Sequence, residues 1–157
     1  MAEGRKLKAE TDQPTLDRVR RFLLALFVVG VIGTIVELLL AQHTEDVLQY
    51  IPFILLGLSL ASLGLHAVLR RRPSMRAFQG VMVLFVAAGV TGSALHYRGK
   101  TEFALERQPD LKGFTLFRAT LKGKNPPMLA PGAMIVLGLL GLIWTYRQPT
   151  EPTGADA

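Results

Sequence analysis

The stretch FLLALFVVGVIGTIVELLLA at residues 22–41 contains a single ionisable side chain, Glu37. A helix rises about 1.5 Å per residue, so about twenty residues cross the roughly 30 Å hydrocarbon core of a bilayer. The stretch is apolar on every face, unlike the amphipathic helices of soluble proteins. No small-residue cleavage pattern follows it, so we interpret residues 22–41 as a retained first transmembrane span.

Three further apolar runs predict transmembrane spans over residues 49–69, 77–96 and 128–146. Short connections make neighbouring helices antiparallel, so the pattern predicts an all-α integral membrane protein whose four transmembrane helices form an up-down bundle over residues 18–147. A soluble bundle is the alternative, but four helices that are apolar all round leave no solvated face. The polar residues 1–17 and 148–157 are expected to form disordered cytoplasmic tails.

Composition narrows the class of protein further. The chain has 157 residues, of which 50% are apolar and 19% are charged, and it has no cysteine. This length fits one domain. The composition excludes a disordered chain, a disulfide scaffold and a thiolate-bound metal site. The absence of a nucleophile–base motif and of a phosphate-binding loop argues against hydrolase or nucleotide chemistry.

The distribution of Lys and Arg predicts the orientation. Six of these residues precede residue 22 and four lie between residues 70 and 76, whereas the connection at 42–50 has none. Positive flanks stay on the cytoplasmic side, so both termini are expected there. The net charge of +6 then marks topology and not binding to nucleic acid. Because the chain is rich in Arg, Ala, Leu and Gly, we expect a bacterial cytoplasmic membrane, with the lipid bilayer as the first partner.

The outer loop at residues 97–127 is too long for a simple turn. Within it, Phe114, Phe117 and Leu121 follow an i, i+3, i+7 spacing, with Arg118 and Lys122 beside them. This spacing predicts a short amphipathic helix that lies in the membrane interface. It would either anchor the loop or cover a site on the outer face.

Glu37 is the clearest candidate for a functional group, because an ionisable side chain inside a span is costly. Imidazole and carboxylate groups at the same outer level could bind a divalent metal such as zinc, iron or manganese. The candidate ligands are Glu37, His43, His96, Glu102 and Glu106. Ordinary electrostatics is the alternative, with Glu37 paired to Arg98 or Lys100.

Haem is not expected. A b-type haem needs two axial ligands on opposite sides of one porphyrin, and His66 and His96 fall at opposite ends of the predicted bundle. Near the cytoplasmic end, polar side chains are instead expected to hold the helices together by hydrogen bonds. These residues are Ser59, Ser62, His66 and Gln79.

Small residues recur in every predicted span, for example Gly57, Ala61 and Gly64 in the second. They indicate close helix packing or, alternatively, a ligand slot. Three functions remain open. The first is a non-catalytic accessory or assembly module, either within a larger membrane complex or as a homo-oligomer. The second is a metal- or cofactor-binding protein with an outward-facing site. The third is a conduit for protons or small solutes, formed by an oligomer and gated by Glu37.

Overall fold

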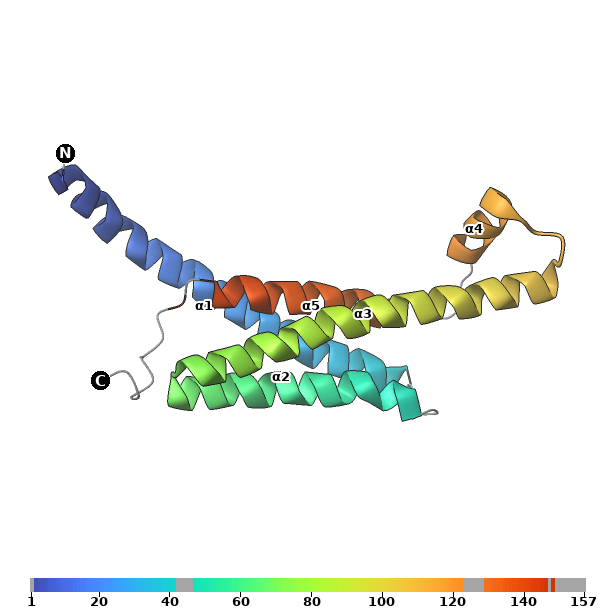
Figure 1. Ribbon diagram of the computed structural model, residues 1–157, viewed down its shortest axis with the longest axis horizontal. Helices are drawn as coiled ribbons and strands as arrows, with labels where there is room; N and C mark the ends of the chain where they lie inside the picture. The colour runs from blue at the N-terminus through green and yellow to red at the C-terminus, as the bar shows by residue number, and fades with distance from the viewer. Residues whose placement is uncertain (1, 42–46, 123–128, 147, 149–157) are drawn as a thin grey trace.

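The chain folds into helices along almost its whole length. The computed structural model describes residues 2–41, 47–122, 129–146 and 148, with side chains from residue 14 onward, and these ranges contain no β-strand. The elements are α1 (Ala2–Leu40), the 3-10 turn η1 (Val47–Gln49), α2 (Tyr50–Leu69), α3 (Arg72–Arg107), α4 (Gly113–Lys122) and α5 (Leu129–Thr145) (Figure 1).

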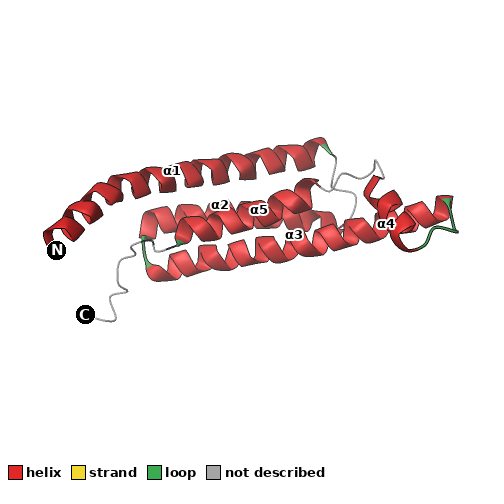
Figure 2. Cartoon of the chain, turned by 90° about the horizontal axis from the view of Figure 1, so that it is seen from above, coloured by secondary structure: helices red, strands yellow, loops and turns green. Residues whose placement is uncertain are grey.

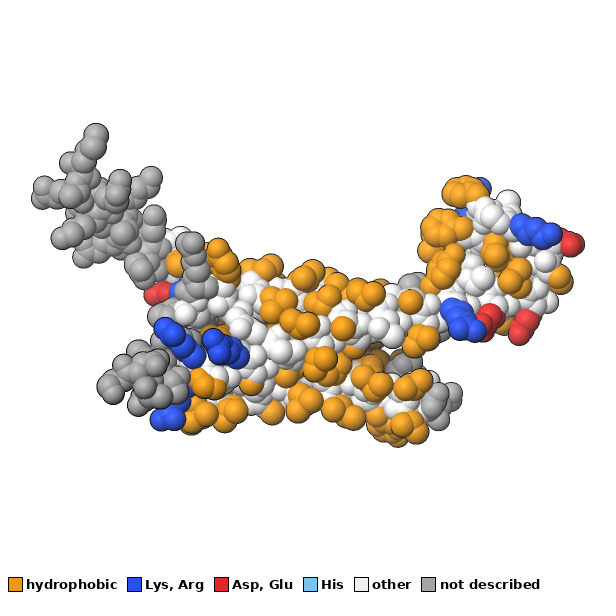
Figure 3. Space-filling model, in the orientation of Figure 1, with side chains coloured by type: hydrophobic (Ala, Val, Ile, Leu, Met, Phe, Trp, Pro, Cys, Tyr) orange, Lys and Arg blue, Asp and Glu red, His pale blue; other side chains and the backbone are white. Residues whose placement is uncertain are grey.

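Three segments are long and apolar enough to cross a membrane, namely Pro14–Leu40, Val47–Leu69 and Arg72–Arg107. Helix α5 is as apolar but has only 17 residues in the described range. Figure 3 shows hydrophobic side chains over the middle of the visible face, with Lys and Arg gathered toward its two ends. Such a surface fits lipid at the middle and polar surroundings at the ends, as expected of a membrane protein.

Helices α3 and α5 form the centre of the fold. They share the most extensive contact, α2 packs on α3, and α1 packs on α5. By contrast, α1 and α2 touch only lightly, although they are neighbours in the chain. Figures 1 and 2 show that α1 crosses the other helices obliquely.

Glycines allow the central helices to approach each other. A Cβ atom added to Gly138 of α5 would lie 2.8 Å from the carbonyl oxygen of Met82 in α3, and one added to Gly89 would lie 2.6 Å from the carbonyl oxygen of Pro131. Between α1 and α5, a Cβ atom added to Gly30 would lie 2.6 Å from the Leu137 side chain. Close backbone approach at small residues is how helices associate in lipid.

Aromatic side chains fill the end of the fold that contains the α2–α3 turn and the end of α5. The Phe27 and Phe78 rings meet edge to face with centroids 5.6 Å apart, and Phe78 and Trp144 meet in the same way. The His66 ring lies 6.2 Å from that of Trp144. These four side chains come from α1, α3, α5 and α2, so this end is tightly joined across all four long helices.

The structure differs from the sequence-based expectations at two places. Helix α1 begins at Ala2, so residues 2–17 continue the first helix where we expected a disordered tail. Helix α3 continues to Arg107, where we expected the span to end near residue 96. Pro14 lies inside α1 without ending it, and the next proline after Pro73 is Pro109, which lies beyond the end of α3.

Residues 97–127 are therefore largely helical in their described part. After α3, a connection of five residues leads into α4, which covers Phe114, Phe117 and Leu121. Helix α4 packs on the C-terminal part of α3, where the Tyr97 and Phe117 rings lie with centroids 6.3 Å apart and the hydroxyl groups of Thr101 and Thr120 lie 3.3 Å apart. The other face of α4 is open, and 76% of Phe114 is exposed.

Candidate functional site

A cavity lies at the end of the fold opposite the aromatic cluster. It has a volume of about 730 Å³, and α1, α2, α3 and α5 all contribute to its walls. Small side chains on α3, at Ala87, Ala88 and Gly92, help leave this space open. Leu55 and Met134 form other parts of a wall that is mainly apolar.

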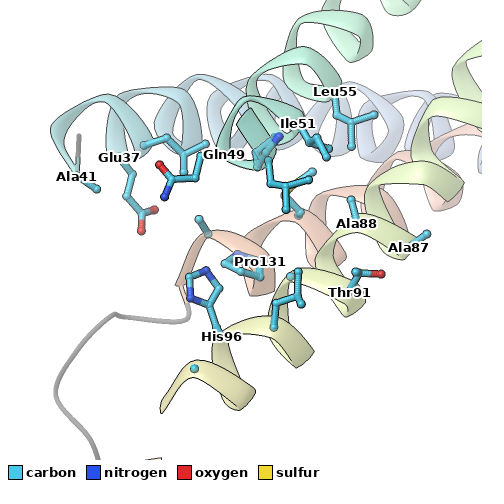
Figure 4. A pocket seen from close by; sticks show the side chains of 18 of the residues that line it. Glu37, Ala41, Gln49, Ile51, Leu55, Ala87, Ala88, Thr91, His96 and Pro131 are labelled. Carbon is cyan, nitrogen blue, oxygen red and sulfur yellow. The ribbon is translucent and has the colours of Figure 1, made fainter. Parts of the chain in front are cut away.

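The polar groups of this cavity are concentrated toward one end. Glu37 of α1, Gln49 of η1 and His96 of α3 all border it, and Figure 4 shows their side chains directed toward the same space. Lys100, one turn beyond His96, also lines it. An apolar interior with a few convergent polar groups is typical of sites for small ligands. We call these four residues the polar rim.

The structure brings together two of the five predicted metal ligands. Glu37 and His96 border the same cavity, whereas Glu102 and Glu106 are exposed on the outer part of α3. His43 lies outside the described residues. Within the described ranges, no three His, Asp or Glu side chains form a group suited to a metal ion. The metal site, with zinc, iron or manganese, stays a prediction.

The alternative pairing of Glu37 with Arg98 does not form. The Arg98 guanidinium donates instead to Glu102, with 2.9 Å between Nε and Oε1, and both side chains are largely exposed. In the described part of the chain, no side chain forms an ion pair or hydrogen bond with the Glu37 carboxylate. Glu37 is half-buried at the edge of the cavity, so its charge faces the space that the rim surrounds.

The predicted polar contacts at the other end form in two different ways. Ser59 and Ser62 donate to backbone carbonyls of their own helix, so their hydroxyl groups do not join helices. Gln79 of α3 donates to the Thr145 hydroxyl of α5 over 3.1 Å and does join two helices. His66 of α2 bonds to Ser74 of α3, with 2.9 Å between Nδ1 and Oγ.

The Ser74 contact also determines the tautomer of His66. The single hydroxyl proton of Ser74 is directed to the Arg71 carbonyl oxygen at 2.8 Å, so Ser74 can only accept from the imidazole. Nδ1 of His66 therefore carries the proton and donates it to Ser74. This bond joins α2 to α3 beside the turn that connects them.

Sequence reasoning missed Ser74, Thr145 and Gln49. Ser74 follows the Arg-rich turn directly after Pro73, and a tight turn at this point would have brought it back beside His66. Thr145 is adjacent to the last aromatic residue of the final span. No pattern marks Gln49, because its place on the rim depends on how the connection from α1 folds.

Comparisons with protein-family models, with curated proteins and with solved structures find no match to this chain.

Proposed function

We propose that this chain is a non-catalytic, multi-pass membrane module that assembles with other membrane helices through one face of α2. A row of five exposed residues supports this proposal. It runs along α2 with alternating spacings of three and four and consists of Ile54, Gly57, Ala61, Gly64 and Val68. Such spacing keeps side chains on one face of a helix and is the pattern of a helix–helix seam.

The glycines of this row differ from those in the interior. A Cβ atom added to Gly57 or Gly64 would have no neighbour within 4 Å, whereas one added to Gly138 would clash with α3. In lipid, small residues allow a second helix to approach closely, and larger apolar residues on either side add contact area. The partner we propose is a second copy of this chain or another protein of a larger membrane complex.

The proposal includes an orientation and a location. The arginines of the α2–α3 turn indicate that this turn, the start of α1 and the end of α5 are on the cytoplasmic side of a bacterial cytoplasmic membrane. Helix α5 is then the fourth span of an up-down bundle, and α4 lies in the outer interface. Phe114 and Leu121 on its open face would contact lipid, whereas the Phe117 ring also lies beside Tyr97 of α3.

The test is extraction from native membranes with a mild detergent, followed by native mass spectrometry. We expect the wild-type chain in an assembly larger than a monomer. Leucine at Gly57 and Gly64 (Gly57→Leu with Gly64→Leu) should shift it toward the monomer, because the larger side chains block close approach.

Gly33→Leu is the matched control. Gly33 is exposed on α1, and a Cβ atom there would also have no neighbour within 4 Å, so this variant should assemble like the wild type. A wild-type chain that leaves the membrane as a lone monomer would refute the assembly proposal.

A further inference from the structure

The cavity at the polar rim has the depth of one lipid leaflet. Along α3 its lining extends from Leu84 to Lys100. The apolar part, from Leu84 to Leu95, covers about 16 Å at 1.5 Å per residue, which is close to half of the roughly 30 Å hydrocarbon core. Leu84 is near the centre of the predicted span 77–96, so the cavity reaches from about mid-membrane to one surface.

The volume of about 730 Å³ is large enough for a flexible hydrocarbon chain, which can follow the mainly apolar wall between the helices.

Helices α1 and α2 both line the cavity but touch each other only lightly. A dry cavity of this size would deprive its lining residues of dispersion contacts, and a hydrocarbon chain from the surrounding lipid restores them.

The polar rim carries charges of both signs. The Glu37 carboxylate comes from α1 and the Lys100 ammonium from α3, and both groups border the same cavity. Gln49 and His96 add groups that form hydrogen bonds. A zwitterionic headgroup such as phosphoethanolamine complements this arrangement, with its ammonium toward Glu37 and its phosphate toward Lys100.

We propose that this cavity binds a phospholipid of the adjacent leaflet, with an acyl chain between the helices and a phosphoethanolamine headgroup at Glu37 and Lys100. This site is separate from the α2 seam. The lipid would act as a structural ligand that fills the loosely packed end of the fold. Binding of the lipid is therefore independent of assembly.

The test uses the full chain in liposomes that contain phosphatidylethanolamine with a diazirine at the end of one acyl chain. After illumination, peptide mapping should place the cross-links deep in the cavity, near Leu84 and Met134. Ala88→Phe fills the cavity and should reduce these cross-links to the level found on lipid-exposed helix faces. Ala94→Phe, on an exposed face of α3 outside the cavity, should leave them unchanged.

A second variant covers the case in which Ala88→Phe fails to fold. Ala41→Phe closes the cavity from the exposed end of α1 and should also remove the deep cross-links. Cross-links that are equally frequent on all lipid-exposed helices, or that persist in a folded cavity-filling variant, would overturn the inference.

The headgroup is tested with phosphatidylglycerol that carries the same diazirine chain. In the wild type, the zwitterionic probe should give several-fold more deep cross-links than the anionic probe. Glu37→Gln should remove this preference while leaving total labelling by both probes measurable. Equal labelling by the two probes in the wild type would refute the headgroup assignment, and a preference that survives Glu37→Gln would refute the role of Glu37.

Discussion

At the scale of the residue, the central helices approach each other closely at glycines, which have no side chain. Gly138 brings the backbones of α3 and α5 together, so even one methyl group there must push them apart. We expect Gly138→Ala to lower the free energy of unfolding by about 1–3 kcal/mol, as overpacking of tight cores does. Denaturation in mixed detergent micelles measures this change.

Gly33→Ala is the matched substitution on an open helix face. Because the new methyl group meets nothing within 4 Å, only helix propensity changes, and stability should stay the same or rise by up to about 1 kcal/mol. Equal losses in the two variants would show that the α3–α5 contact is not the cause.

The hydrogen bond between His66 and Ser74 allows a second test at this scale. His66→Phe keeps an aromatic ring beside Trp144 and removes the donor, and Ser74→Ala removes the acceptor. The double-mutant cycle should give a coupling energy of about 0.6–2 kcal/mol, the range for polar contacts between helices in lipid. A coupling near zero would mean that the bond adds no net stability.

At the scale of the element, the α2–α3 turn places a non-glycine residue in the left-handed region. Arg70 ends α2 with φ of 50°, and its N–H donates to the carbonyl of His66. This conformation costs a residue with a Cβ atom about 1 kcal/mol, and glycine avoids most of this cost. We therefore expect Arg70→Gly to increase stability by up to about 1 kcal/mol in the same denaturation assay.

Arg72→Gly serves as the comparison. It removes the same charge from the same turn, but Arg72 is already the first residue of α3 and has no left-handed backbone to relieve. This variant should be no more stable than the wild type. A gain in both variants would point to charge and not to backbone conformation.

The proposed position of α4 at the membrane surface gives a separate prediction. Because the chain has no cysteine, Phe114→Cys and Lys112→Cys each introduce one site for a nitroxide label. In liposomes, the label at position 114 should be more accessible to oxygen, which partitions into lipid. The label at 112 should be more accessible to a water-soluble nickel complex. The reverse order would mean that α4 does not lie on the membrane.

At the scale of the whole molecule, the apolar runs predicted the positions of the long apolar helices better than the residues at which those helices end. The three segments that are long and apolar enough to cross a membrane overlap three of these runs, and α5 overlaps the fourth. We expected α3 to end near residue 96 because the residues that follow are mostly polar. The segment Thr101 to Arg107 nevertheless contains good helix formers, and the helix continues through it. The cavity was not predicted as a unit, because its walls come from four helices whose relative tilt is not encoded in any local pattern.

The length of α3 has a mechanical consequence. Its 36 residues form one continuous helix about 54 Å long, and α4 packs on its outer part (Figure 1). A tilt of about 5° at its inner end displaces its tip by about 5 Å. Because α3 also forms one wall of the cavity, the same rotation changes the cavity's width. The single helix α3 thus connects the part of the chain on which α4 packs with the wall of the cavity.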